Sequence, residues 1–142
     1  YTIAVITLLV VAMGFVPAAN ADFELTQNDL VVGASTNHND VLMAVEVLNG
    51  RVYPSFQMFV QNVNEVSCQK ADTVIKVNGQ RLKAVITPNS LYCVYSPSTA
   101  AGAKFVMDQL KTKEIIDWSG SLIPTKGFKA AFKELLDTDN VL

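Results

Sequence analysis

The only histidine of the chain lies in a polar stretch that also holds the other two residue types of a hydrolytic relay. Ser35 could act as a nucleophile, His38 as its base and Asp40 as the group that orients the base. Such relays usually meet through the fold, whereas short polar side chains that bond to nearby backbone are typical of turns. The residues favour a surface loop. A small envelope hydrolase that uses His38 or an acidic pair is the alternative function.

Other motifs for catalysis, cofactors or metals are missing from the sequence. The chain contains no G-x-S-x-G, no glycine-rich phosphate loop and no H-E-x-x-H. The stretch around His38 lacks the alternating acids and central glycine of a calcium loop, and one histidine cannot build a histidine-rich zinc site. We therefore predict no catalytic, cofactor-binding or metal-binding residues and no cofactor.

The first 21 residues differ from the rest of the chain. They are mostly apolar, and every charged residue lies at or beyond Asp22. The apolar run 3–16 is shorter than the roughly 20 residues that span a bilayer, and Ala19 and Ala21 occupy the positions that a signal peptidase reads. We interpret residues 1–21 as a signal peptide and residues 22–142 as one domain, periplasmic or secreted. The alternative is a membrane-tethered or filament subunit that retains residues 1–19, although the early glutamate of type IV pilins is missing.

Export changes the interpretation of the two cysteines. An oxidising compartment favours a bridge, and the chain has neither a C-x-x-C spacing nor a histidine near either thiol in the sequence. We therefore predict a disulfide between Cys68 and Cys93, with Cα atoms within about 7 Å of each other.

Two Asn-Gly pairs predict type I′ hairpins, because both residues of such a turn need positive φ. A two-residue loop at Asn49-Gly50 fixes the register of the first hairpin. The residues that then share one apolar face are Val41 with Met58, Met43 with Phe56, Val45 with Pro54, and Val47 with Val52. Because Pro54 has no N–H to offer a further strand, the sheet should have an edge or a bulge there.

The second hairpin, around Asn78-Gly79, separates apolar from basic residues. Ile75, Val77, Leu82, Ala84 and Ile86 share one face, and Lys76, Arg81 and Lys83 share the other. Residues 66–103 carry a net charge of +3, whereas residues 22–65 carry −5. The three basic residues are our candidate partner surface, for an acidic partner, and the alternative is a solvated sheet face.

The C-terminal part of the mature chain predicts two helices and further strands. Residues 91–95 and 114–118 resemble strands, and Ser96-Pro97 indicates the start of a helix with Pro97 at its first position. The last helix should begin after Pro124 with Thr125 as its N-cap. The apolar stripes of the two helices are Ala103, Val106, Met107 and Leu110, and Phe128, Ala131, Phe132, Leu135 and Leu136. We expect an α+β fold in which two C-terminal helices cover an antiparallel sheet with one disulfide.

The composition of the chain argues against some classes of function but does not identify one. A net charge of −2 gives no electrostatic case for nucleic acid. We expect an exported, non-enzymatic module that acts by protein binding, such as an inhibitor, an immunity protein or an envelope accessory protein. Its partner would be another protein, with no membrane contact after the signal peptide is removed.

The signal-peptide interpretation predicts a mature protein that begins at Asp22. Intact-mass spectrometry of the exported protein should show the loss of residues 1–21. Recovery of the uncut chain from the membrane fraction would instead support the tethered alternative.

Overall fold

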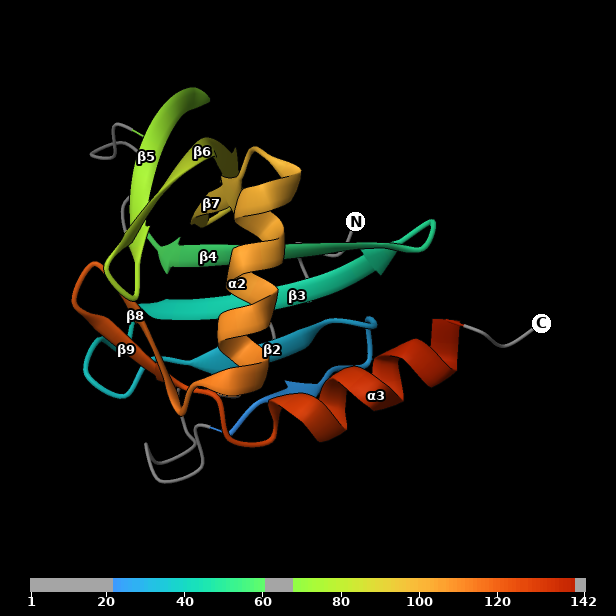
Figure 1. Ribbon diagram of the computed structural model, residues 1–142. Helices are drawn as coiled ribbons and strands as arrows, with labels where there is room; N and C mark the ends of the chain where they lie inside the picture. The colour runs from blue at the N-terminus through green and yellow to red at the C-terminus, as the bar shows by residue number, and fades with distance from the viewer. Residues whose placement is uncertain (1–21, 61–67, 140–142) are drawn as a thin grey trace.

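The computed structural model describes residues 22–60 and 68–139, so the expected signal peptide lies outside the described residues. These residues form one antiparallel sheet, in the strand order β1-β2-β3-β4-β7-β6-β5-β8-β9, that curls around two helices (Figure 1). The elements in chain order are β1 (Glu24–Leu25), β2 (Val31–Ala34), β3 (Val41–Leu48), β4 (Arg51–Phe59), β5 (Ala71–Val77), β6 (Gln80–Asn89), β7 (Tyr92–Pro97), α2 (Ala100–Thr112), β8 (Ile115–Trp118), β9 (Ser121–Pro124) and α3 (Phe128–Asp139). The α+β prediction is confirmed.

Both predicted hairpins have the expected turns and registers. Asn49 and Gly50 have φ of 53° and 76°, and Asn78 and Gly79 have 48° and 83°. Val45 lies opposite Pro54 in the first hairpin, and Lys76 lies opposite Arg81 in the second. Two further hairpins with two-residue turns, which we did not predict, join β6 to β7 and β8 to β9.

The inner face of the curled sheet packs against both helices. Phe56 of β4 is fully buried, and its ring stacks on that of Trp118 of β8 with 5.0 Å between centroids. The predicted apolar stripes supply the helical side of this core, including Leu110 of α2 and Phe128 of α3. Burying a side chain of this size stabilises the fold by roughly 1.5–3 kcal/mol. The inner face is therefore the structural core.

Both helix starts differ from the prediction. Pro97 is still part of β7, paired with Ala84 of β6, and the Thr99 hydroxyl caps α2 by accepting the Gly102 N–H at 2.9 Å. The strand continues because pairing with β6 extends through Pro97, whose missing N–H is not needed on that side. At the second helix, the Thr125 hydroxyl donates to the Lys113 carbonyl and does not cap α3. The Ala131 N–H donates to the carbonyl of Gly127, the residue just before α3.

Two prolines separate β4 from β7. These strands pair from Phe56 with Tyr95 to Phe59 with Tyr92, and in the same register the next hydrogen-bonded pair after Phe56–Tyr95 would be Pro54 with Pro97. A pair at that position would exchange two N–H···O bonds, yet neither proline has an N–H. The ladder therefore stops, which confirms the predicted sheet edge at Pro54.

The predicted disulfide is present. Cys68, just before β5, is bonded to Cys93 of β7, with 5.9 Å between their Cα atoms. Because β6 lies between β5 and β7, the bond ties together strands that do not pair directly.

Removing the disulfide should destabilise the domain. For a closed loop with a sequence separation of 25, the chain-entropy estimate is about 3.5 kcal/mol. We expect the Cys68→Ser/Cys93→Ser variant to lose about that much free energy of unfolding in urea. The oxidised wild type is the control. Equal stability of the wild type with and without reductant would contradict the prediction.

Candidate functional site

The outer face of the sheet, opposite the helices, holds a second apolar cluster. Its buried members are Leu30, Val32, Leu42, Ala44 and Tyr92. The Tyr92 ring packs edge-on against Phe59, and burial raises the pKa of its phenol, so Tyr92 is neutral across the physiological range. The cluster gives the outer face an apolar floor next to the place where β4 and β7 separate.

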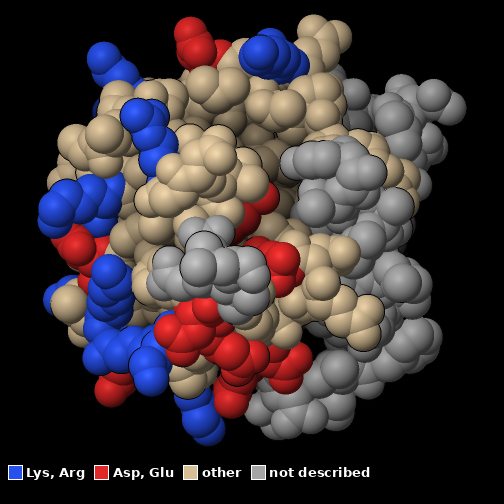
Figure 2. Space-filling view, turned by 90° about the vertical axis from the view of Figure 1, so that its right-hand side faces the viewer, with Lys and Arg blue, Asp and Glu red and all other residues tan. Residues whose placement is uncertain are grey.

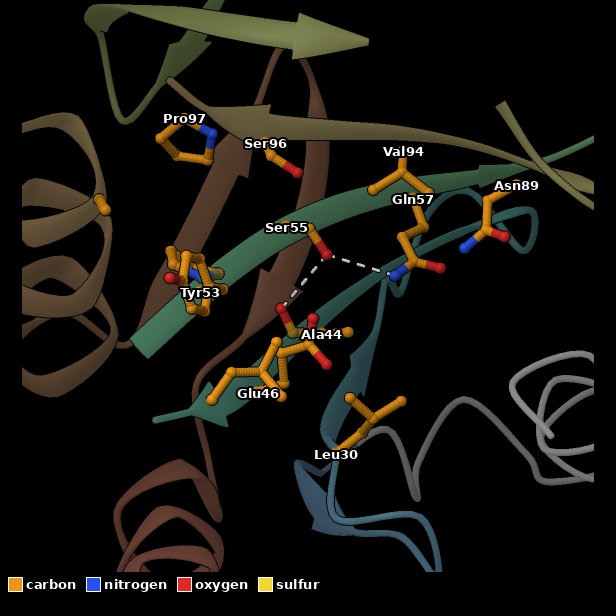
Figure 3. A pocket seen from close by; sticks show the side chains of 13 residues that line it. Leu30, Ala44, Glu46, Tyr53, Ser55, Gln57, Asn89, Val94, Ser96 and Pro97 are labelled. Atoms are coloured by element: carbon orange, nitrogen blue, oxygen red, sulfur yellow. Dashed lines mark hydrogen bonds between the residues drawn. The ribbon is translucent and has the colours of Figure 1, made fainter. Parts of the chain in front are cut away.

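A hollow of about 210 Å³ lies where β4 and β7 separate (Figure 3). It reaches through the gap between these strands as far as Ala103 of α2 on the inner side. The other lining residues are Leu30, Ala44, Glu46, Leu48, Tyr53, Pro54, Ser55, Gln57, Asn89, Val94, Ser96 and Pro97. Ligand pockets for drug-sized molecules usually measure about 300–1,000 Å³. The hollow therefore has the size for one or two amino-acid side chains.

Gln57 is the most unusual polar residue of this hollow. Its side chain is only 4% exposed, and its Nε2 donates to the Ser55 hydroxyl at 3.2 Å. The Ser55 hydroxyl in turn donates to the Ala44 carbonyl at 3.5 Å. Gln57 Oε1 is buried and accepts no hydrogen bond from the described part of the chain. A buried acceptor without a donor costs about 1–3 kcal/mol, and this oxygen has almost no accessible surface, so a ligand could reach it only if the side chain moved.

Glu46 makes the hollow acidic. It is the one charged residue of the lining, and its partial burial raises the pKa of its carboxyl. The lining also holds polar side chains such as Asn89 and Ser96, so the Glu46 carboxyl lies among polar and apolar walls in similar measure. Such a lining suits an apolar group that ends in N–H donors or a positive charge.

The candidate partner surface lies on the outer face of the β5–β6 hairpin, where Lys76, Arg81 and Lys83 are all exposed. Val74, which is 50% exposed, lies directly opposite Lys83. Within residues 22–60 and 68–139, the only ion pair joins two other residues, Lys104 and Asp108. The three cations therefore lie on one side of an exposed apolar side chain, with Asp72 of the same face on the other.

Charge is unevenly distributed on the side of the molecule that Figure 2 shows. Acidic side chains gather in the lower middle of this view, basic ones lie mainly along its left, and uncharged atoms fill much of the upper middle. Electrostatic attraction to a partner therefore depends on local patches, since the net charge of the chain is only −2.

The loop around His38 does not assemble the relay considered from the sequence. The Ser35 hydroxyl donates to Asn37 Oδ1 at 2.8 Å, and the His38 ring Nδ1 lies 3.0 Å from the hydroxyl of Ser121 in β9. Asp40 contributes its backbone carbonyl, which accepts the Phe59 N–H at 2.7 Å. The structure thus pairs His38 with Ser121, a residue that the sequence analysis did not consider.

Asn37 joins the same loop to β9 and closes the curl of the sheet. Its Oδ1 accepts the Leu122 N–H at 2.9 Å, and its Nδ2 donates to the Gly120 carbonyl at 2.8 Å. Beside it, the Thr36 N–H donates to the Leu122 carbonyl at 2.9 Å. We call this contact between the end of β2 and β9 the seam. A structural role of the loop explains its polar residues.

Searches for metal sites and membrane spans gave no candidates. Within the described ranges, no three His, Cys, Asp or Glu side chains are grouped so that they could hold a metal ion. Neither α2 nor α3 is long and apolar enough to cross a membrane. No protein-family model, curated protein or solved structure matches the chain.

Asn37 should contribute measurably to stability through the seam. Asn37→Ala removes three side-chain hydrogen bonds that are partly exposed, so we expect a loss of about 1–3 kcal/mol in the free energy of unfolding. The matched control is Asn39→Ala, at an exposed position two residues further on, for which we expect a change within about 0.5 kcal/mol. Equal losses in both variants in urea would show that Asn37 has no special role.

Proposed function

We propose that this protein is an exported, non-enzymatic binding module that holds another protein through the outer face of its sheet. The observation that carries the proposal is the apolar surface left exposed on this helix-free face. Three of the large hydrophobic side chains found exposed in the described residues belong to it: Leu48 at 52%, Tyr53 at 45% and Val74 at 50%. Exposed apolar groups beside charge of one sign are typical of protein interfaces.

The disulfide supports the export part of the proposal. Bonded cysteines persist mainly in oxidising compartments such as the periplasm or the extracellular space. An inhibitor, an immunity protein or an envelope accessory protein would fit a small domain of this kind.

The basic face of the β5–β6 hairpin should speed association with an acidic partner. We expect Lys76→Gln/Arg81→Gln/Lys83→Gln to lower the association rate about tenfold at low salt and to weaken its salt dependence, with little change in stability. The partner would be captured from envelope extract by crosslinking and then purified for kinetic measurements. The charge-matched control is Lys126→Gln/Lys129→Gln/Lys133→Gln, whose lysines are exposed next to and on α3. An unchanged rate in the basic-face variant would remove this surface from the proposal.

The contact between His38 and Ser121 favours a hydrolase as a second candidate function. A serine hydroxyl 3.0 Å from a histidine nitrogen is the geometry of a nucleophile with its base. The same envelope experiment separates the two functions. Failure to capture a partner, together with ester hydrolysis that is lost in His38→Ala, would support the hydrolase.

A further inference from the structure

Among the described residues, no strand pairs with the edge of β4 between Val52 and Ser55 on the side where β7 pairs further along. In a two-residue hairpin, the pairs at Arg51, Tyr53 and Ser55 exchange hydrogen bonds with β3. The intervening residues, Val52 and Pro54, therefore direct their backbone polar groups away from β3. The edge offers the Val52 N–H and C=O and the Pro54 C=O, spaced as a strand would require.

The hollow lies on this same edge. Tyr53, Ser55 and Gln57 project from β4 to the outer face, and the opposite wall is formed by Val94, Ser96 and Pro97 of β7 (Figure 3). A chain that paired with β4 here would place the side chain opposite Tyr53 on the outer face as well. That side chain would enter the hollow between the two strands.

From these observations we propose that the partner adds an extended segment to the free edge of β4 and inserts a lysine or arginine side chain into the hollow. The inference rests on the proposed function. The apolar walls match the aliphatic stem of such a side chain. Its charged end would meet the Glu46 carboxylate, and no lysine or arginine of the described residues lines the hollow. Strand addition is a common way in which proteins bind extended peptides.

The decisive variant removes one backbone donor from the edge. Val52→Pro deletes the outward N–H without removing a hydrogen bond to β3, because Val52 lies at a non-hydrogen-bonded pair with Val47. Val52→Ala is the matched control, since it shortens the same side chain and keeps the N–H. Thermal melts would establish that both variants fold.

The probe is a set of capped seven-residue peptides in which threonine and valine alternate around a central lysine, leucine or aspartate. We expect the lysine peptide to bind the wild type most tightly, and Val52→Pro to bind it at least tenfold more weakly than Val52→Ala does. Glu46→Gln should reduce the preference for lysine over leucine severalfold. Equal affinities of Val52→Pro and Val52→Ala, or no binding by any peptide, would overturn the proposal.

Hydrogen exchange of the wild type gives a test that needs no variant. The Val52 amide should exchange rapidly in the free protein and slow at least tenfold with the lysine peptide, whereas the Tyr53 amide should be protected in both states. A Val52 amide that stays unprotected in the complex would contradict strand addition. Protection of Val52 through self-association, seen as a dimer that Val52→Pro abolishes, would identify the occupant as a second copy and overturn the assignment to a partner.

Failure of this inference can be told apart from failure of the proposed function. A captured partner that binds Val52→Pro and Val52→Ala equally would leave the binding function in place and reject strand addition. Peptide binding that protects the Val52 amide, without any partner in the envelope extract, would support strand addition to β4 and count against the proposed binding function.

Discussion

The distribution of backbone N–H donors decides the shape of this protein. The ladder between β4 and β7 ends where Pro54 would face Pro97, because that pair has no donor on either side. A similar limit ends the pairing of β5 with β6 at Ile86, since the next hydrogen-bonded position on β6 is Pro88. The strands diverge beyond these points, so the sheet can curl around its helices and leave a hollow between β4 and β7.

The two faces of the sheet have different roles as a result. The inner face is filled by aromatic and aliphatic side chains, such as Phe56 against Trp118, and supplies the core. The outer face has its own apolar cluster but also exposes Val74 and Tyr53. The inner face holds the larger of the two buried clusters, whereas the outer face carries a buried acceptor at Gln57 that has no donor among the described residues. An unpaired acceptor is tolerable in a fold whose core is complete elsewhere.

Much of the sheet could be predicted from local sequence, because a two-residue Asn-Gly turn sets both the hairpin and its register. The strands β1, β2 and β9 were missed although each pairs with its neighbour in sequence. The strands β1 and β2 have only two and four residues, and no Asn-Gly turn marks the loops that follow them or the turn before β9. The predicted start of α2 was wrong, because Pro97 pairs with β6 and remains part of β7 despite the preference of proline for the first position of a helix. The site was also missed. Nothing next to Gln57 in the sequence indicates that its side chain is buried. Asn37 resembles any turn residue, and its role depends on β9, which lies beside it only in the folded chain. The turn before β9 did have a signal in the sequence, the pair Ser119-Gly120.

The seam also has a consequence for the order in which the chain folds. Asn37 and Leu122 are 85 residues apart in sequence, whereas each hairpin closes over two residues. The entropy lost in closing a loop rises with its length, so the hairpins can form early and the seam only after most of the sheet exists. The two outermost parts of the sheet therefore meet late in folding. Until they do, the backbone of β9 is an open template on which another chain could pair, and the rate of that last step sets how long the chain is exposed to aggregation.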